Sequence, residues 1–174
     1  MKARRYWDSS VFIAWLLPEE NRKAQCQQVL REAKRGEIVI VTSAITLTEV
    51  IKLKGHPPIG EEQEDKIRKF FLHEYFVVAA VDRAIGELAR KLIWRHGLKP
   101  KDSIHVATAI HLKIPVIHTF DLKDMGPLDG KVGTPPVKVM EPTVPQPDLP
   151  FGDTGGPTES DELDVDLAGG GEPN

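Results

Sequence analysis

The sequence predicts an α/β fold: a three-layer α/β/α domain built on a central, mainly parallel sheet of four or five strands. Two observations carry this prediction. Short runs of β-branched and aromatic residues alternate along the chain with longer segments of helical periodicity, and a chain of 174 residues with 40% hydrophobic content suits one well-packed domain. Strands separated by helices favour parallel pairing, because each crossover returns the chain to the same edge of the sheet.

The predicted strands are short and apolar. The second is almost continuously β-branched, which is typical of a parallel strand covered on both faces. In chain order the strands are expected at 5–8, 37–42, 76–81, 115–120 and 137–140.

The helices follow from apolar spacing and from residues that begin or end helices. Gly36 suits the end of a helix, and Ser43 and Asp82 suit the start of one. The predicted helices span 11–17, 21–35, 44–54, 61–73, 83–96 and a final segment, 101–110, that begins after Pro100.

This final helix, from Lys101 to Ile110, sets one acidic residue at the start of an otherwise nearly apolar segment. Asp102 there has an ordinary explanation, since a carboxylate in the first turn compensates unpaired backbone N–H groups and the helix dipole. Its second explanation, a functional one, depends on acids elsewhere in the chain.

Charge and cysteine content indicate the setting of the protein. All 23 Lys and Arg lie within residues 1–142 together with 18 Asp and Glu, so this part carries a net charge of +5. A single cysteine, Cys26, excludes a disulfide framework within one chain and favours a reducing, cytoplasmic location. The apolar run 11–17 is too short to span a membrane.

The composition divides the chain into two parts. Residues 1–142 form the expected folded domain, whereas 143–174 hold eight acids, no Lys or Arg, and many Pro and Gly. Such a segment buries too little apolar area to offset its ordering entropy, so we expect a disordered acidic tail.

Four acids fall where a parallel sheet would gather them. Asp8 ends the first strand, Asp121 ends the fourth, Glu49 lies in the helix after the second, and Asp102 starts the helix that leads into the fourth. Four carboxylates at one edge repel one another, which raises their pKa values unless a cation compensates. An all-oxygen ligand set suits Mg²⁺ or Mn²⁺, and Asp124 adds a further carboxylate nearby.

Histidine-based metal sites are disfavoured by spacing. None of the six histidines forms an i, i+4 pair, which argues against zinc hydrolase chemistry. His105 lies three residues after Asp102, and two interpretations stay open for it: a residue that orients Asp102, or an ordinary packed histidine.

Together these motifs resemble the PIN domain, and most closely the VapC-type toxins of prokaryotic toxin–antitoxin pairs. The resemblance covers residues 4–141 and depends on Asp8 before a helix, Thr48-Glu49, Asp102-x-x-His105-x-Ala107-x-Ala109, and Thr119-x-Asp121. It implies a cytoplasmic, metal-dependent endoribonuclease that is usually homodimeric and pairs with an antitoxin protein. The implied metal-binding acids are Asp8, Glu49, Asp102 and Asp121, with Asp124 as an extra acid and with Ser9 and Thr119 as supporting hydroxyls.

Basic residues cluster just before Asp102 and are candidates for binding RNA phosphates, with Trp94 as a stacking surface. Individually each would be ordinary solvated surface, and function is expected only of the group. They are Arg90, Lys91, Arg95, Lys99 and Lys101.

Rival interpretations differ in chemistry. A phosphotransfer receiver domain needs paired acids after the first strand, but here Asp8 is followed by Ser9 and Ser10. A haloacid-dehalogenase-type phosphatase needs a second Asp two residues after the first, and this position holds Ser10. Two alternatives stay open: a PIN-like module that binds RNA or protein without cutting, and a stand-alone RNA-processing nuclease.

Overall fold

The computed structural model describes residues 2–16, 20–51 and 60–143, so the predicted tail lies outside the described residues apart from Thr143. The strands are β1 (Ala3–Trp7), β2 (Ile38–Ser43), β3 (Phe76–Ala79), β4 (Val116–His118) and β5 (Lys138–Met140). The helices are α1 (Ser9–Leu16), α2 (Glu20–Lys34), α3 (Thr46–Glu49), α4 (Glu64–Phe71), α5 (Arg83–His96), α6 (Pro100–His111) and α7 (Leu122–Met125), with 3-10 helices η1 (Glu61–Gln63) and η2 (Gly126–Leu128).

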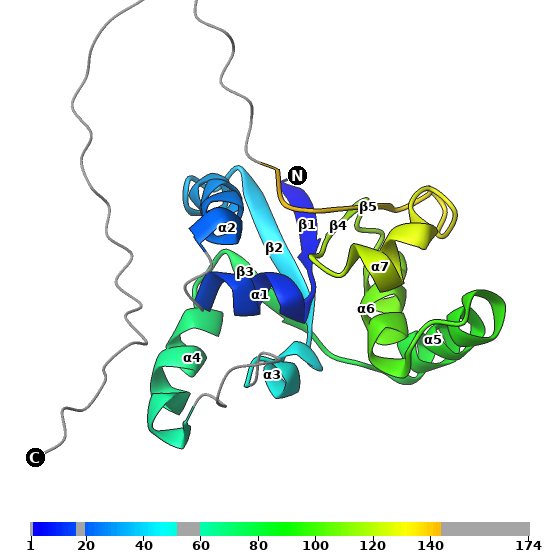
Figure 1. Cartoon of the computed structure of the whole chain (residues 1–174), viewed down its shortest axis with the longest axis horizontal. Coiled ribbons are helices and arrows are strands. Elements are labelled where there is room, and N and C mark those ends of the chain that lie inside the picture. Colours follow the sequence, from blue (N-terminus) through cyan, green and yellow to red (C-terminus); the bar gives the residue numbers. More distant parts are fainter. Residues whose placement is uncertain (1, 17–19, 52–59, 144–174) are drawn as a thin grey trace, which may run out of the picture.

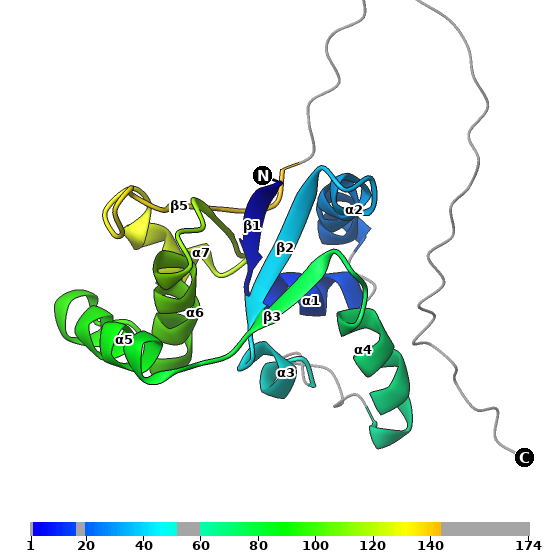
Figure 2. The ribbon, with the colours of Figure 1, turned by 180° about the vertical axis from the view of Figure 1, so that it is seen from behind.

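The five strands form one sheet in the order β3-β2-β1-β4-β5. Every pairing in it is parallel. The expected α/β class and parallel sheet are therefore confirmed, and Figures 1 and 2 show the sheet between two groups of helices.

Each face of the sheet carries its own apolar core. Helices α1, α2 and α4 cover one face, and α5, α6 and α7 lie on the other (Figure 1). Successive residues of β1 point to opposite faces, so Tyr6 packs in the core with α5 and α6 whereas Trp7 packs in the core with α1, α2 and α4. Among the described residues, no helix combines the length and the apolar character needed to cross a membrane.

The carboxyl ends of β1 and β4 lie side by side. Trp7 pairs in register with His118, so the residues that follow these two strands, Asp8 and Thr119, emerge next to each other. This juxtaposition places side chains that are more than 100 residues apart in sequence at one edge of the sheet, as the parallel arrangement predicts.

Helix boundaries follow local chemistry. Asp82 caps α5 by accepting a hydrogen bond from the Ile85 amide, and the helix ends at Gly97, which adopts a φ of 68°. Pro100 occupies the first turn of α6, where its missing N–H costs nothing.

The helix expected at 44–54 is shorter than predicted. Only Thr46–Glu49 is helical, and Val50 leaves the helical conformation with a ψ of 53°. β-branched residues have low helix propensity, and the segment contains several of them, which explains the early end. Residues 52–54 of the predicted helix lie outside the described residues.

Candidate metal centre

Three aspartates come together at the carboxyl edge of the sheet. One carboxylate oxygen from each of Asp102, Asp121 and Asp124 lies within 4.8 Å of the others. Asp102 stands in the first turn of α6, Asp121 caps α7 directly after β4, and Asp124 lies inside α7. The group therefore joins two helix N-termini, where the helix dipole favours anions.

Of the three aspartates, Asp102 has the carboxylate that a bound cation would stabilise most. Burial raises the pKa of its carboxyl, and the nearby charges of Asp121 and Asp124 raise it further, against an opposing effect of Lys99. Its Oδ2 atom is buried and has no hydrogen-bond partner in the described structure. A divalent cation would supply the missing partner and relieve the repulsion, and three carboxylates are ligands suited to Mg²⁺ or Mn²⁺. The residues present therefore fit such an ion.

Asp8, the residue after β1, is not a member of this three-aspartate group. Its carboxylate is hydrogen-bonded to residues at the ends of β1 and β4 instead. Its Oδ1 accepts hydrogen bonds from the Ser10 hydroxyl at 2.6 Å and the Val11 amide at 3.3 Å, and its Oδ2 accepts one from the Thr119 hydroxyl at 2.8 Å. The side chain is buried, and burial raises the pKa of the carboxyl, with the hydrogen bonds partly opposing this.

Two hydroxyls bind the ends of β1 and β4 together. Thr119 Oγ1 also accepts a hydrogen bond of 2.9 Å from the Asp121 amide, so one hydroxyl contacts two of the predicted metal-binding acids. Ser10 Oγ likewise accepts from the Phe120 amide at 2.8 Å. Asp8 is thus in contact with the hydroxyls of Ser10 and Thr119, and the predicted supporting residue Ser9 lines, together with Ser10, a cavity of about 210 Å³ beside Asp121.

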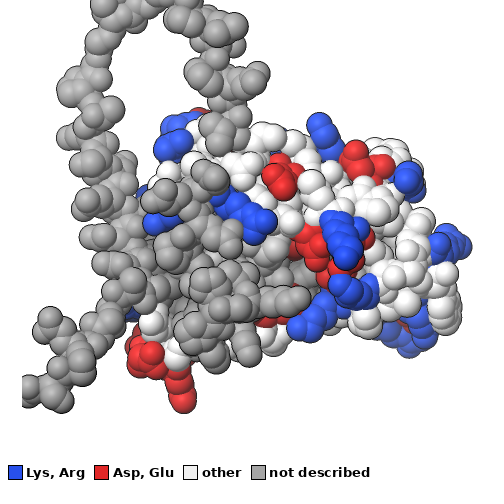
Figure 3. Space-filling view, viewed as in Figure 1, with Lys and Arg blue, Asp and Glu red and all other residues white. Residues whose placement is uncertain are grey.

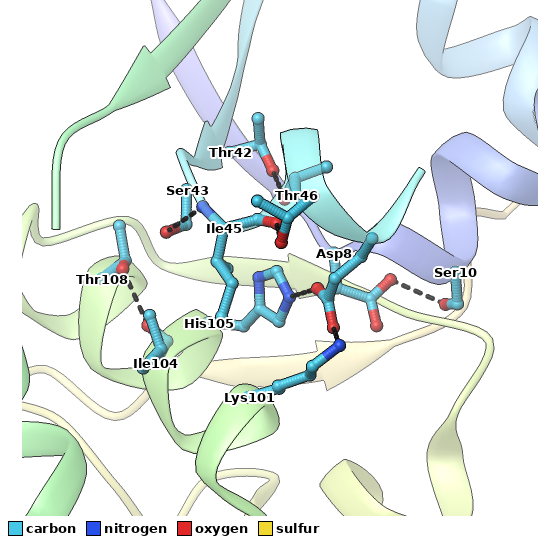
Figure 4. A network of polar contacts seen from close by, with 12 residues as sticks. Asp8, Ser10, Thr42, Ser43, Ile45, Thr46, Lys101, Ile104, His105 and Thr108 are labelled. Carbon is cyan, nitrogen blue, oxygen red and sulfur yellow. Dashed lines mark hydrogen bonds and ion pairs between the residues drawn. The ribbon is translucent and has the colours of Figure 1, made fainter. Parts of the chain in front are cut away.

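Glu49, the last residue of α3, is bound to two residues of α6, His105 and Lys101, which Figure 4 labels. Its Oε2 lies 2.7 Å from Nε2 of His105, and its Oε1 lies 3.3 Å from Nζ of Lys101. Burial disfavours its charged form, but His105 and Lys101 outweigh burial, and the pKa of Glu49 lies below its ordinary value. Glu49 is not a member of the three-aspartate group, although both of its partners flank Asp102 on α6.

His105 contacts different residues from the one that its spacing suggested. Its Nδ1 lies 2.8 Å from the Tyr6 hydroxyl and its Nε2 faces Glu49, so both ring nitrogens are directed to residues other than Asp102. Sequence reasoning missed Tyr6, because nothing in a buried strand position signals such a partner. Ser10 stands only two residues after Asp8 in the sequence, which brings its hydroxyl within reach of that carboxylate.

The predicted basic residues divide into two sets. Lys99 and Lys101 form ion pairs with Asp124 and Glu49, and a compact group of acidic side chains bordered by basic ones is visible over α6 and α7 in Figure 3. The others are exposed on α5 beside Trp94, whose surface is 73% accessible. They are Arg90, Lys91 and Arg95. Arg90 lies over the Trp94 ring, with its Cζ 5.2 Å from the ring centroid.

Comparisons with known proteins assign the chain to a family. The family model of the PIN domain matches residues 5–124. The fold is similar to that of VapC20 from Mycobacterium tuberculosis, a sarcin–ricin loop cleaving toxin, with a TM-score of 0.57, 18% identity, and coverage of 71% of this chain and 94% of that one. It is also similar to a chain of a toxin–antitoxin complex from Klebsiella pneumoniae, with a TM-score of 0.56, 21% identity, and coverage of 80% and 98%.

None of the curated proteins matches the chain. The family model nevertheless spans most of the described domain, from β1 to α7, and includes Asp8, Glu49, Asp102, Asp121 and Asp124. The chain belongs to the PIN domain family.

Proposed function

We propose that this protein is an endoribonuclease that depends on Mg²⁺ or Mn²⁺ and hydrolyses RNA phosphodiester bonds. The observation that carries the proposal is the group formed by Asp102, Asp121 and Asp124, in which Asp102 has a raised pKa and an unpartnered buried oxygen. Membership of the PIN domain family and the fold of a sarcin–ricin loop cleaving toxin support the same activity.

Each acid has a part in the proposed site. Asp102, Asp121 and Asp124 would hold the cation directly, and Asp8 and Glu49 would complete the predicted set from β1 and α3. When bound, the cation would activate a water molecule and neutralise charge on the phosphate. Thr119 keeps Asp8 and the start of α7 in fixed relation, because its one hydroxyl bonds to both.

The exposed surface of α5 is the proposed place of RNA contact. Arg90, Lys91 and Arg95 present positive charge to solvent beside Trp94, whose exposed ring offers a stacking surface for a base. Lys99 and Lys101, next along the chain, stand between this surface and the acids. The RNA would thus reach the site along α5 and the start of α6.

We further propose that the protein is the toxin of a toxin–antitoxin pair, acting as a homodimer in the cytoplasm. Its similarity in fold to VapC20 and to a chain of a toxin–antitoxin complex supports this role. The single, buried cysteine fits a reducing compartment. Co-expression with the product of any small neighbouring reading frame, followed by size-exclusion chromatography with light scattering, tests both the partner and the oligomeric state.

Incubation of the purified full chain with a mixture of structured and single-stranded RNAs tests the activity. We expect cleavage in Mg²⁺ or Mn²⁺ and none in EDTA. Asp121→Asn should abolish cleavage, whereas Asp65→Asn, at an exposed position of α4, should leave it intact. Binding of RNA without cleavage in any metal would instead support a non-catalytic RNA-binding module.

A further inference from the structure

A buried hydrogen-bonded chain connects three elements of the fold. The Tyr6 hydroxyl of β1 lies 2.8 Å from Nδ1 of His105 on α6, and Nε2 of the same ring lies 2.7 Å from Oε2 of Glu49 on α3. Tyr6 is fully buried and His105 is 1% exposed. The imidazole therefore has little room to turn, and its two ring nitrogens face two different residues.

The distances indicate which atoms of the Tyr6–His105–Glu49 hydrogen-bonded chain carry the protons. Nε2 faces a carboxylate at hydrogen-bond distance, and two acceptors do not face each other at 2.7 Å, so Nε2 carries a proton and donates it. In the neutral ring Nδ1 is then the acceptor, and the Tyr6 hydroxyl is its donor. Tyr6 thus fixes the tautomer that lets His105 donate to Glu49.

Glu49 depends on this contact more than a residue of a long helix would. Helix α3 has four residues and no side-chain cap, so its own hydrogen bonds fix its end weakly. Besides His105, the carboxylate contacts Lys101, whose side chain is 62% exposed. The rigid partner of Glu49 is therefore His105, which stands one turn from Asp102 on the same helix.

We propose that His105, held by Tyr6, is a positioning residue that orients Glu49 toward the cation site and thereby sets its affinity for the divalent ion. This inference rests on the proposed function, because it assumes that Glu49 contributes to that site. In this role His105 would contact neither the cation nor the RNA and would act through the carboxylate to which it donates.

Binding of Mn²⁺ to the EDTA-treated full chain, followed by electron paramagnetic resonance, tests the inference without any turnover. His105→Leu should weaken Mn²⁺ binding about tenfold, as is usual for loss of a residue that supports a metal ligand. His105→Gln keeps an N–H donor and should restore part of the affinity. Tyr6→Phe, which removes only the hydroxyl, should weaken binding by a smaller factor. His111→Leu, an exposed histidine at the far end of α6, is the matched control.

The Glu49→Gln background separates positioning from a general loss of structure. There His105→Leu should cause little further change in Mn²⁺ affinity, because the carboxylate that it orients is gone. Equal Mn²⁺ affinity of wild type, His105→Leu and Tyr6→Phe would overturn the inference, as would an undiminished effect of His105→Leu in the Glu49→Gln background. If His105→Leu does not fold, Tyr6→Phe and His105→Gln decide the matter by the same measurement.

The two proposals fail in different ways. A wild-type chain that neither binds Mn²⁺ nor cleaves RNA would overturn the proposed function. A wild-type chain that binds Mn²⁺, together with variants of His105 and Tyr6 that bind it equally well, would overturn only the positioning role.

Discussion

The Thr119 hydroxyl donates a hydrogen bond of 2.8 Å to Oδ2 of Asp8, across a separation of 111 residues in the sequence. Both side chains are buried at the carboxyl edge of the sheet. A buried carboxylate that loses a hydrogen-bond donor has the cost of its desolvation less well compensated. The contact therefore couples the stability of the fold to the geometry of the proposed site.

Replacing Thr119 with Val tests this coupling. We expect Thr119→Val to lower the free energy of unfolding at neutral pH by about 1–3 kcal/mol, the usual cost of leaving a buried polar group unpaired. Thr119→Ser keeps the hydroxyl and should lie close to wild type. Urea denaturation of the metal-free protein measures both. Equal destabilisation by Val and Ser would assign the effect to the lost shape of the side chain and not to the hydrogen bond.

Removing the charge of Lys101 should change the affinity for the cation and the affinity for RNA in opposite directions. Its Nζ lies 3.3 Å from Oε1 of Glu49, so it competes with a cation for that carboxylate while adding positive charge for phosphates. Lys101→Gln should strengthen Mn²⁺ binding about two- to threefold, in keeping with the small energy of exposed ion pairs. It should also weaken RNA binding and reduce its salt dependence by about one phosphate contact.

Calorimetric titration with Mn²⁺ and RNA binding at several salt concentrations measure the two effects. The exposed Lys138→Gln on β5 is the matched control and should change neither. Weaker binding of both ligands by Lys101→Gln would contradict the competition, since it would show that Lys101 only supports the local structure.

His118 makes the stability of the metal-free protein depend on pH. Burial lowers the pKa of its imidazole to about 4, and the nearby charge of Arg5 adds to this effect. Trp7 Nε1 donates to its Nδ1 at 3.2 Å, which requires an unprotonated nitrogen there. The unfolded chain binds a proton at this histidine near pH 6.5, so stability is present above that pH and is lost as the pH falls toward 4.

Between neutral pH and pH 5, this group should cost about 2 kcal/mol of stability. His118→Gln keeps an acceptor for Trp7 but does not titrate, so its urea-denaturation midpoint should fall less than that of wild type over the same range. His96→Gln, at the exposed end of α5, should follow wild type. The same loss of stability in wild type and His118→Gln would show that other groups carry the pH dependence.

The sequence predicted the sheet well because strands and parallel connections leave strong local signals. Continuous β-branched runs, Gly36 and Asp82 placed the elements around β2 and α5, and the rule for carboxyl ends placed Asp8 near the loop that holds Asp121. The same rule predicted Asp102 and Asp121 at one edge with Asp8 and Glu49, whereas the structure groups Asp102 and Asp121 with the additional acid Asp124.

The side-chain partners could not be predicted, because they depend on tertiary geometry. His105 pairs with Tyr6 and Glu49, which are 99 and 56 residues away, and the sequence could offer only its spacing from Asp102. The pairing of Lys101 with Glu49 has no local signal either.

Two differences between the sequence prediction and the structure have local causes. The helix expected at 44–54 ends at Glu49, because β-branched side chains lose rotational freedom in a helix and this segment contains several of them. The sequence predicts Asp8 at one edge of the sheet with Glu49, Asp102 and Asp121; in the structure its oxygens accept hydrogen bonds from Ser10 and Thr119, and its place in the cation site stays a prediction.

The central claim is that Asp102, Asp121 and Asp124 hold a divalent cation. Anomalous diffraction from crystals grown with Mn²⁺ tests it most directly. We expect an anomalous peak among these three carboxylates, at the start of α6 and α7, and loss of that peak in crystals of Asp121→Asn. Crystals that bind Mn²⁺ elsewhere and show no peak among the three carboxylates would contradict the claim.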